Sequence, residues 1–192
     1  MAMLMNVPNI LTLLRILAIP VFVIIFYLPW EGRFFWTTFI FCTAAITDWF
    51  DGYLARKLEQ TSKFGAFLDP VADKLMVVMA LIMIVDRNPT PFPDFVLTLA
   101  AAIIISREIL ISALREWMAQ IGERAQVAVS IIGKIKTFVQ LFAIPFLLYK
   151  HDIGDFPTVE VGFVLICIAA ALTIWSMLIY LKDSWHILTG QD

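Results

Sequence analysis

Six long apolar runs, separated by short polar or proline-containing links, set the pattern of the chain. An α-helix needs about 20 residues to cross roughly 30 Å of hydrocarbon, and each run is close to that length. No internal repeat and no low-complexity segment breaks the series, so the pattern predicts a single all-α integral membrane domain over residues 1–192. The six expected transmembrane helices are Ile10–Leu28, Phe34–Leu58, Asp69–Val85, Phe95–Met118, Val127–Tyr149 and Val159–Leu181.

Local signals refine where these helices start. Residues 1–9 are expected to form a short amphipathic entry, in which Pro8 and Asn9 start the first helix. Pro70 is expected in the first turn of the third helix, where its missing N–H costs nothing. Asp94, which follows a loop with three prolines, is expected as the N-cap of the fourth helix.

Composition supports the membrane class. The 192 residues are 61% hydrophobic and 16% charged, with a mean hydropathy of +0.87, whereas a soluble domain carries about 25% charged residues. The net charge of −2 and the lack of a basic tract argue against nucleic acid as a partner. The first apolar run continues through Pro20 to Trp30 without a small-residue cleavage site, so it is interpreted as a retained helix. Cys42 and Cys167 lie inside apolar runs and are interpreted as small buried hydrophobic residues.

The distribution of Lys and Arg predicts the orientation. Six crossings place both termini on one side of the membrane, and the side richer in Lys and Arg faces the cytoplasm. Eleven basic residues fall on the side of the termini and three on the opposite side, so both termini are expected in the cytoplasm. The eleven are Arg15, Arg56, Lys57, Lys63, Lys74, Arg107, Arg115, Arg124, Lys134, Lys136 and Lys182, and the three are Arg33, Arg87 and Lys150.

Four aspartates concentrate in one stretch of this apolar chain. Asp48 and Asp51 are three residues apart, and Asp69 and Asp73 are four apart, so each pair shares one face of a helix. Two such pairs that meet across a helix contact would form a cage of oxygen ligands without His or thiolate, which favours Mg²⁺ or Mn²⁺, with room for one or two ions.

Residues beside the aspartates are suited to a phosphate or nucleotide ligand. Gly52 and Gly65 allow close approach of the backbone, and Arg56 offers a forked donor. Arg107 is 12 residues into its expected helix, about 18 Å along the axis, so charges of several helices reach one depth in the cytoplasmic half of the membrane. A single charge at that depth is as often a snorkelling or structurally paired side chain, but a convergent set indicates a functional site.

The aspartates form part of a longer motif. The spacing D-x2-D-G-x2-A-R-x8-G-x3-D-x3-D, from Asp48 to Asp73, resembles the signature of the CDP-alcohol phosphatidyltransferase family at all eight fixed positions. The segments N-x-P-N-x-L-T-x-x-R from Asn6, S-R-E-I-x-I-S-A-L-R from Ser106 and G-K-x-K-T-x-x-Q from Gly133 are similar to those of bacterial members that use glycerol 3-phosphate.

The resemblance implies an enzyme of the bacterial inner membrane, a six-helix homodimer with a cytoplasmic active site. It would transfer a phosphatidyl group from CDP-diacylglycerol to sn-glycerol 3-phosphate, giving phosphatidylglycerol phosphate and CMP. It also implies that Asp48, Asp51 and Asp69 bind metal, with Asp73 as ligand of a second ion or as general base. Gly52, Arg56 and Gly65 would line the CDP site together with Asp48 and Asp51.

The phosphate of the acceptor needs cations of its own. Arg107 and Arg115 are eight residues apart, about 80° around a helix, and can address one pocket. The alternative for Arg107 is a structural ion pair with a glutamate. Lys134 and Lys136 are about 200° apart, so only one can point inward, and Lys134 is the expected one. Thr12 and Arg15 are weaker candidates.

Two other functions remain open at this point. The same chemistry could act on serine, inositol phosphate or phosphatidylglycerol, which would differ at the basic residues and not at the aspartates. A divalent-cation transporter would use intramembrane acids too, but it predicts interrupted helices at matching positions of two halves. The aspartates here fall only in the second and third expected helices, which disfavours a transporter.

Overall fold

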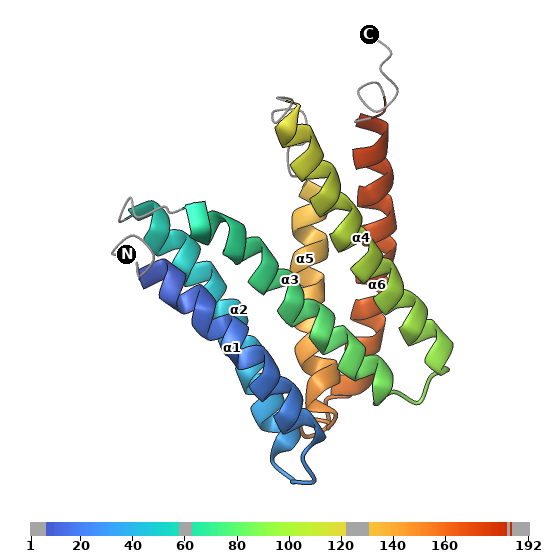
Figure 1. The fold of residues 1–192 in the computed structure, drawn as a ribbon. Coiled ribbons are helices and arrows are strands. Elements are labelled where there is room, and N and C mark those ends of the chain that lie inside the picture. The colour runs from blue at the N-terminus through green and yellow to red at the C-terminus, as the bar shows by residue number, and fades with distance from the viewer. Residues whose placement is uncertain (1–6, 58–62, 122–130, 184, 186–192) are drawn as a thin grey trace. The chain divides into compact units, whose positions relative to one another are not determined.

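The computed structural model describes residues 7–57, 63–121, 131–183 and 185, and these residues form six α-helices (Figure 1). The helix bounds lie close to the ends of the apolar runs, because each run is long enough to form one continuous helix. The helices are α1 (Val7–Tyr27), α2 (Arg33–Lys57), α3 (Lys63–Asp86), α4 (Asp94–Gln120), α5 (Ile131–Tyr149) and α6 (Thr158–Asp183).

The helices divide between two compact units. Unit 1 comprises Met1–Pro89 and Pro145–Val159, and therefore holds α1, α2, α3 and the last turn of α5. Unit 2 comprises Thr90–Ile144 and Glu160–Asp192, and holds α4, most of α5 and nearly all of α6.

In unit 1, α1 packs against both α2 and α3. The buried positions of α1 fall on one face and divide along the helix, with Asn9, Thr12 and Arg15 in the first half and Phe22 and Phe26 in the second. The aromatic half contacts α2, where the ring centroids of Phe22 and Phe41 are 6.4 Å apart. The apolar half thus anchors α1 to its neighbours, while the polar half carries groups that need partners when they are buried.

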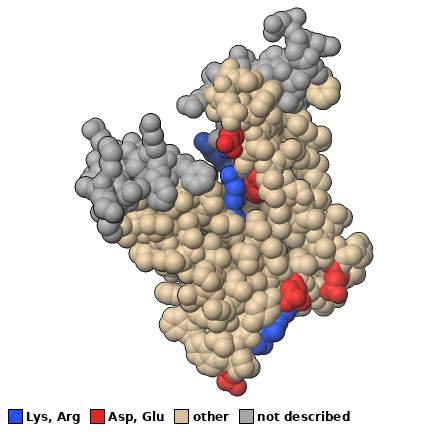
Figure 2. Space-filling model, viewed as in Figure 1, with Lys and Arg blue, Asp and Glu red and all other residues tan. Residues whose placement is uncertain are grey.

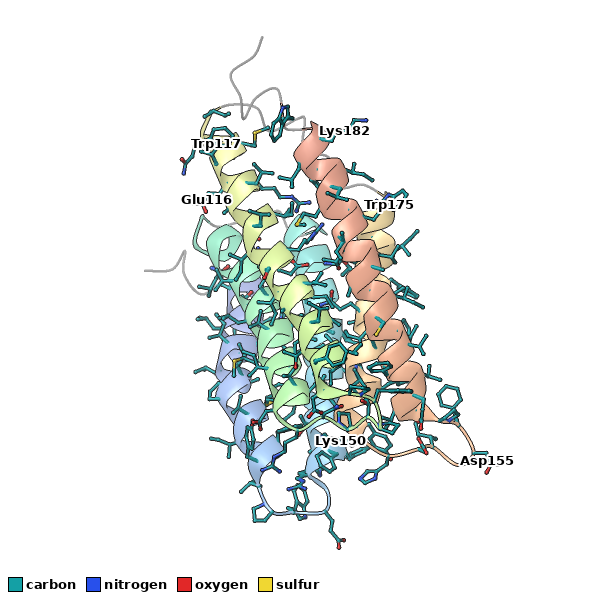
Figure 3. The ribbon with its side chains drawn as sticks, turned by 90° about the vertical axis from the view of Figure 1, so that its right-hand side faces the viewer. Glu116, Trp117, Lys150, Asp155, Trp175 and Lys182 are labelled. Carbon is teal, nitrogen blue, oxygen red and sulfur yellow. The ribbon has the colours of Figure 1, made fainter. Side chains whose placement is uncertain are left out.

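In unit 2, the buried face of α4 repeats every three or four residues and contains one charge. The series is Leu97, Ala100, Ala101, Ile104, Arg107, Ile111, Leu114 and Met118. On α5 the corresponding positions include Lys136 and Gln140, and on α6 they include Thr173, Ser176 and Tyr180. Figure 3 places Glu116 and Trp117 of α4 at the same end as Lys182 of α6, so the polar stretches of these two helices lie toward the same end of unit 2.

Three helices are long and apolar enough to cross a membrane by length and composition, namely Asn9–Tyr27, Asp94–Gln120 and Thr158–Lys182 among the described residues. Large apolar side chains are exposed along their outer faces, as at Leu17 and Trp175. In the view of Figure 2, most of the visible surface is uncharged. These features are those of a membrane protein.

Two expected helix starts are wrong. The third helix begins at Lys63, six residues before Asp69, so Pro70 lies inside α3 and not in its first turn. An interior proline loses its own N–H from the ladder and crowds the carbonyl four residues before it, yet α3 continues past Pro70. At α4 the N-cap is Pro93, with a φ of −57° and a ψ of 132°, and Asp94 is the first helical residue. The extended geometry that an N-cap requires is already met by the proline.

The first helix also starts earlier than expected, and the expected start of the fifth helix lies outside the described residues. Helix α1 begins at Val7, so Pro8 lies in its first turn. Residues 7–9 of the expected amphipathic entry therefore belong to α1, whereas residues 1–6 and the first residues of the fifth expected helix, 127–130, lie outside the described residues.

A cluster of cations and aromatic rings closes one end of unit 1. Lys150 follows α5 with a positive φ of 60° and donates a hydrogen bond to the carbonyl oxygen of Arg87. Its ammonium nitrogen lies 5.1 Å from the ring centroid of Phe26 and 5.2 Å from that of Phe34. Burial, together with the neighbouring Arg87 and Arg33, lowers the pKa of Lys150 to about 8.

Candidate functional site

The four signature aspartates lie on two helices of unit 1. Helix α2 carries Asp48 and Asp51 in its second half, and α3 carries Asp69 and Asp73 in its first half. The side chains of Asp51 and Asp69 lie outside the described residues, as do Gly52 and Arg56 of the expected CDP site. Gly65 is described and is buried on α3.

Asp48 is paired with a buried arginine of α1. The Nη1 atom of Arg15 donates to Oδ1 of Asp48 at 2.5 Å, and the Arg15 side chain is only 2% exposed, against 38% for Asp48. Arg15 had been expected as a weaker contact of the acceptor phosphate. In the structure its guanidinium neutralises and orients a predicted metal ligand.

Asp73 lines a cavity together with Arg15. A small cavity of about 20 Å³ is lined by Arg15 and Asp73, with apolar walls from α2 and α3. A volume of this size accommodates about one water-sized particle. Asp48 and Asp73, from two helices, thus both adjoin Arg15.

These residues fit a hard divalent cation. Carboxylate oxygens are the donors that Mg²⁺ uses in proteins. Asp48 pairs with Arg15, and Asp73 lines the cavity beside Arg15. Within the part of the chain that the structure describes, no three His, Cys, Asp or Glu residues gather into a metal site. The other two aspartates of the expected cage, Asp51 and Asp69, belong to the side chains that are not described.

Unit 2 contains a cluster of opposite sign. Glu108 of α4 accepts from Nζ of Lys136 on α5, and the same Oε1 atom lies 3.3 Å from Nη1 of Arg107. Lys136 is 1% exposed, so an ammonium group is held inside the helix packing by this carboxylate. Burial of an ion is tolerated only with such a partner.

The inward lysine is Lys136, whereas Lys134 was expected. Lys134 is exposed, and Lys136 lies in the buried series that continues to Gln140 one turn later. As expected, only one of the two lysines points inward, but that lysine is Lys136 and not Lys134. In this orientation of α5, Lys136 pairs with Glu108.

Arg115 reaches a residue that the sequence did not single out. Its Nη2 atom donates to the phenol oxygen of Tyr180 on α6 at 2.8 Å. The guanidinium carbons of Arg115 and Arg107 lie 5.5 and 5.8 Å from the centroid of the Tyr180 ring. Tyr180 and Glu108 therefore organise the predicted basic residues. The one available signal was the polar repeat Thr173, Ser176, Tyr180 along α6.

Membrane-length apolar helices that carry buried, paired charges are typical of an integral membrane enzyme or transporter. A profile of the CDP-alcohol phosphatidyltransferase family matches residues 5–175. The chain belongs to the CDP-alcohol phosphatidyltransferase family.

Curated relatives resemble the chain along most of its length. The chain is 54% identical over 177 residues to the CDP-diacylglycerol–glycerol-3-phosphate 3-phosphatidyltransferase of Haemophilus influenzae, covering 92% of each chain. It is 51% identical over 178 residues to the proteins of the same name from Escherichia coli K12 and Shigella flexneri, covering 92% of this chain and 93% of theirs. Members of this family are generally metal-dependent.

Proposed function

We propose that this chain transfers the phosphatidyl group of CDP-diacylglycerol to sn-glycerol 3-phosphate, forming phosphatidylglycerol phosphate and CMP. The observation that carries the proposal is 51–54% identity, over 92% of the chain, to relatives whose names state this transfer. The aspartate signature and the basic residues of α4 and α5 supply the chemistry that such a transfer needs.

The proposed site for the nucleotide end of the lipid substrate is the signature of α2 and α3. Asp48, Asp51, Asp69 and Asp73 would hold the metal, taken as two Mg²⁺ or Mn²⁺ ions, and Gly52, Arg56 and Gly65 would contact the CDP group. Divalent cations held by these residues would supply charge neutralisation for the pyrophosphate and the leaving CMP. The pairing of Arg15 with Asp48 supports the assignment, because carboxylates that hold metal are commonly oriented by outer partners.

Asp73 is the proposed general base. It would accept the proton of the 1-hydroxyl of glycerol 3-phosphate as that oxygen attacks the phosphorus that carries the diacylglycerol. A new P–O bond forms to the acceptor, the pyrophosphate P–O bond breaks, and CMP leaves with the electron pair. Asp73 is exposed in unit 1 and lines the cavity beside Arg15, which supports its access to an incoming hydroxyl.

The proposed site for the acceptor phosphate is the basic cluster of unit 2, with Arg107, Arg115 and Lys136 as the main contacts. Arg107 and Lys136 share one carboxylate, Glu108, and Arg115 donates to the Tyr180 hydroxyl. The surplus of positive charge matches a phosphate monoester, which carries nearly two negative charges at neutral pH. Lys134, Thr12 and Arg15 are secondary candidates.

The proposed setting is the bacterial inner membrane, with all six helices spanning it and both termini in the cytoplasm. The three basic residues assigned to the far side support this topology. Lys150 donates a hydrogen bond to the carbonyl oxygen of Arg87, and burial, together with the charges of Arg87 and Arg33, lowers the pKa of Lys150. The three residues therefore lie together at one end of unit 1. The proposed assembly is a homodimer. A measurement of the apparent mass of the protein in detergent tests this proposal.

The experiment that tests the function is an assay in mixed micelles with CDP-diacylglycerol and Mg²⁺. Glycerol 3-phosphate, serine, inositol phosphate and phosphatidylglycerol are offered in parallel, and release of CMP is followed. Release that requires glycerol 3-phosphate is the expected result. Release with another acceptor and none with glycerol 3-phosphate would overturn the proposed substrate.

A further inference from the structure

Tyr180 of α6 lies against two arginines that belong to a different helix. Its phenol oxygen accepts a hydrogen bond from Nη2 of Arg115 at 2.8 Å. Its ring centroid is 5.8 Å from the guanidinium carbon of Arg107 and 5.5 Å from that of Arg115. Both distances are within the range of cation–π attraction.

This arrangement brings together two side chains that their helix keeps apart. Arg107 and Arg115 are about 12 Å apart along the axis of α4 and about 80° apart around it. A long, flexible arginine side chain at such a distance would otherwise sample many rotamers. One aromatic ring that both guanidinium groups contact restricts them to a common neighbourhood.

The tyrosine itself is rigidly held. It is 3% exposed and forms an apolar cluster with Ile111, Leu114 and Met118. A buried phenol normally finds a hydrogen-bond partner, and here that partner is a cation. The ring is therefore a fixed platform, and the arginines are the groups whose position it determines.

The cluster retains capacity for an anion. The Nε atom of Arg107, a hydrogen-bond donor, is buried without an acceptor among the described residues. Glu108 is the carboxylate that Arg107 and Lys136 share, so the positive charge in this part of unit 2 exceeds the negative.

We propose that Tyr180 is a positioning residue, which holds Arg107 and Arg115 in the geometry that binds the phosphate of the acceptor. This inference rests on the proposed function. It makes α6, which carries no residue of the family signature, a part of the specificity-determining site. Tyr180 acts through the two arginines and need not touch the substrate itself.

The test measures steady-state kinetics of Tyr180→Phe, which removes the phenol oxygen and keeps the ring. The apparent KM for glycerol 3-phosphate is expected to rise roughly tenfold, the effect of one hydrogen bond to a charged group. The KM for CDP-diacylglycerol and the melting temperature stay at their wild-type values. Tyr180→Leu, which also removes the cation–π platform, raises the KM for glycerol 3-phosphate further. The matched control is Tyr149→Phe, which removes a phenol oxygen from unit 1 and leaves both KM values unchanged.

A double-mutant cycle separates positioning from a structural role. If Tyr180 acts through Arg115, then Tyr180→Phe has no further effect on the KM for glycerol 3-phosphate in an Arg115→Ala background. Additive effects, a fall in kcat with both KM values unchanged, or wild-type kinetics of Tyr180→Phe would overturn the role. A wild-type enzyme that releases no CMP with glycerol 3-phosphate overturns the proposed function instead, and this is seen before any variant is assayed.

Discussion

The two units use the same structural device, a buried cation paired with a more accessible carboxylate. In unit 1 a cation, Arg15, is 2% exposed and is paired with the more accessible carboxylate of Asp48 on another helix. In unit 2 a cation, Lys136, is 1% exposed and is paired with the more accessible carboxylate of Glu108 on another helix. Burial and pairing are thus nearly identical in the two clusters, and they do not distinguish a metal site from a phosphate site.

The ratio of charges distinguishes them. In unit 1, Asp48 pairs with the Arg15 guanidinium and Asp73 lines a cavity with Arg15, and the signature adds two further aspartates on the same two helices. In unit 2, Arg107 and Lys136 share one carboxylate, and Arg115 joins them through Tyr180. An acidic surplus attracts cations and a basic surplus attracts anions, so the comparison assigns metal to one unit and phosphate to the other.

The largest effect on activity is expected from replacement of Asp73, which tests the metal-binding side of this comparison. Replacement by Asn keeps the shape of the side chain and removes its charge and basicity. Turnover is expected to fall about 10²- to 10⁴-fold, the usual loss of a general base, while binding of CDP-diacylglycerol is largely retained. CMP release and equilibrium binding of the lipid measure the two effects.

A second aspartate of the same helix provides the control. Asp86 lies at the other end of α3, where it accepts a hydrogen bond from the Tyr27 hydroxyl at 2.7 Å. Asp86→Asn is expected to keep nearly full activity. A near wild-type rate in Asp73→Asn would remove Asp73 from the reaction.

In unit 2 the sharpest prediction compares two lysines that are two residues apart. Lys136→Met removes the buried cation beside Glu108, so the apparent KM for glycerol 3-phosphate is expected to rise roughly 10- to 100-fold. Lys134 is exposed, and Lys134→Met is expected to change that KM less than about twofold. Steady-state kinetics with both substrates varied provides the measurement, and a larger effect at Lys134 would reverse the assignment.

Apolar run length predicted all six helices but could not fix every end. The bounds of α2 and α6 differ from the expected ones by one or two residues, because their runs end at charged or turn residues. The start of α3 was misplaced because Gly65 and Pro70 are both breakers in isolation. The structure shows that the helix continues through both.

The candidate site, like the helix ends, could be predicted from the sequence only in part. The spacing of the aspartates is a local property of two helices, so the sequence was sufficient to single them out. Glu108 and Tyr180 gain their roles from contacts with residues 28 and 65 positions away along the chain. The choice of Lys136 over Lys134 depends on the rotation of α5, which is decided by packing and not by periodicity alone. Long-range partners of this kind leave no local pattern.

Arg15 is the buried partner of a proposed metal ligand in unit 1. Its replacement should lower activity less than the replacement of Asp73 does. In Arg15→Met, Asp48 loses the donor that orients one of its oxygens. Activity is expected to fall roughly tenfold, and half-maximal activity should require more Mg²⁺, since partners of metal ligands contribute about this much. Titration of Mg²⁺ at saturating substrates measures both. The control is Arg33→Met, and an unchanged Mg²⁺ requirement in Arg15→Met would restrict Arg15 to a structural role.

The smallest effect is expected at Lys150, a cation that is hydrogen-bonded to a carbonyl oxygen. Lys150 donates to the carbonyl of Arg87; burial and the charges of Arg87 and Arg33 lower its pKa, and Asp86 raises it. Its pKa of about 8 lies below the ordinary value of 10.5. Between these two pH values the unfolded chain therefore holds the proton and the folded chain has released it. Stability then rises with pH across this window, and the contribution of Lys150 is least favourable below pH 8. The melting temperature of the wild type relative to Lys150→Met should consequently increase from about pH 8 to pH 10, whereas the exposed Lys182→Met shows no such trend. A pH-independent difference for Lys150→Met would mean that its ammonium group is as well solvated as one on the surface.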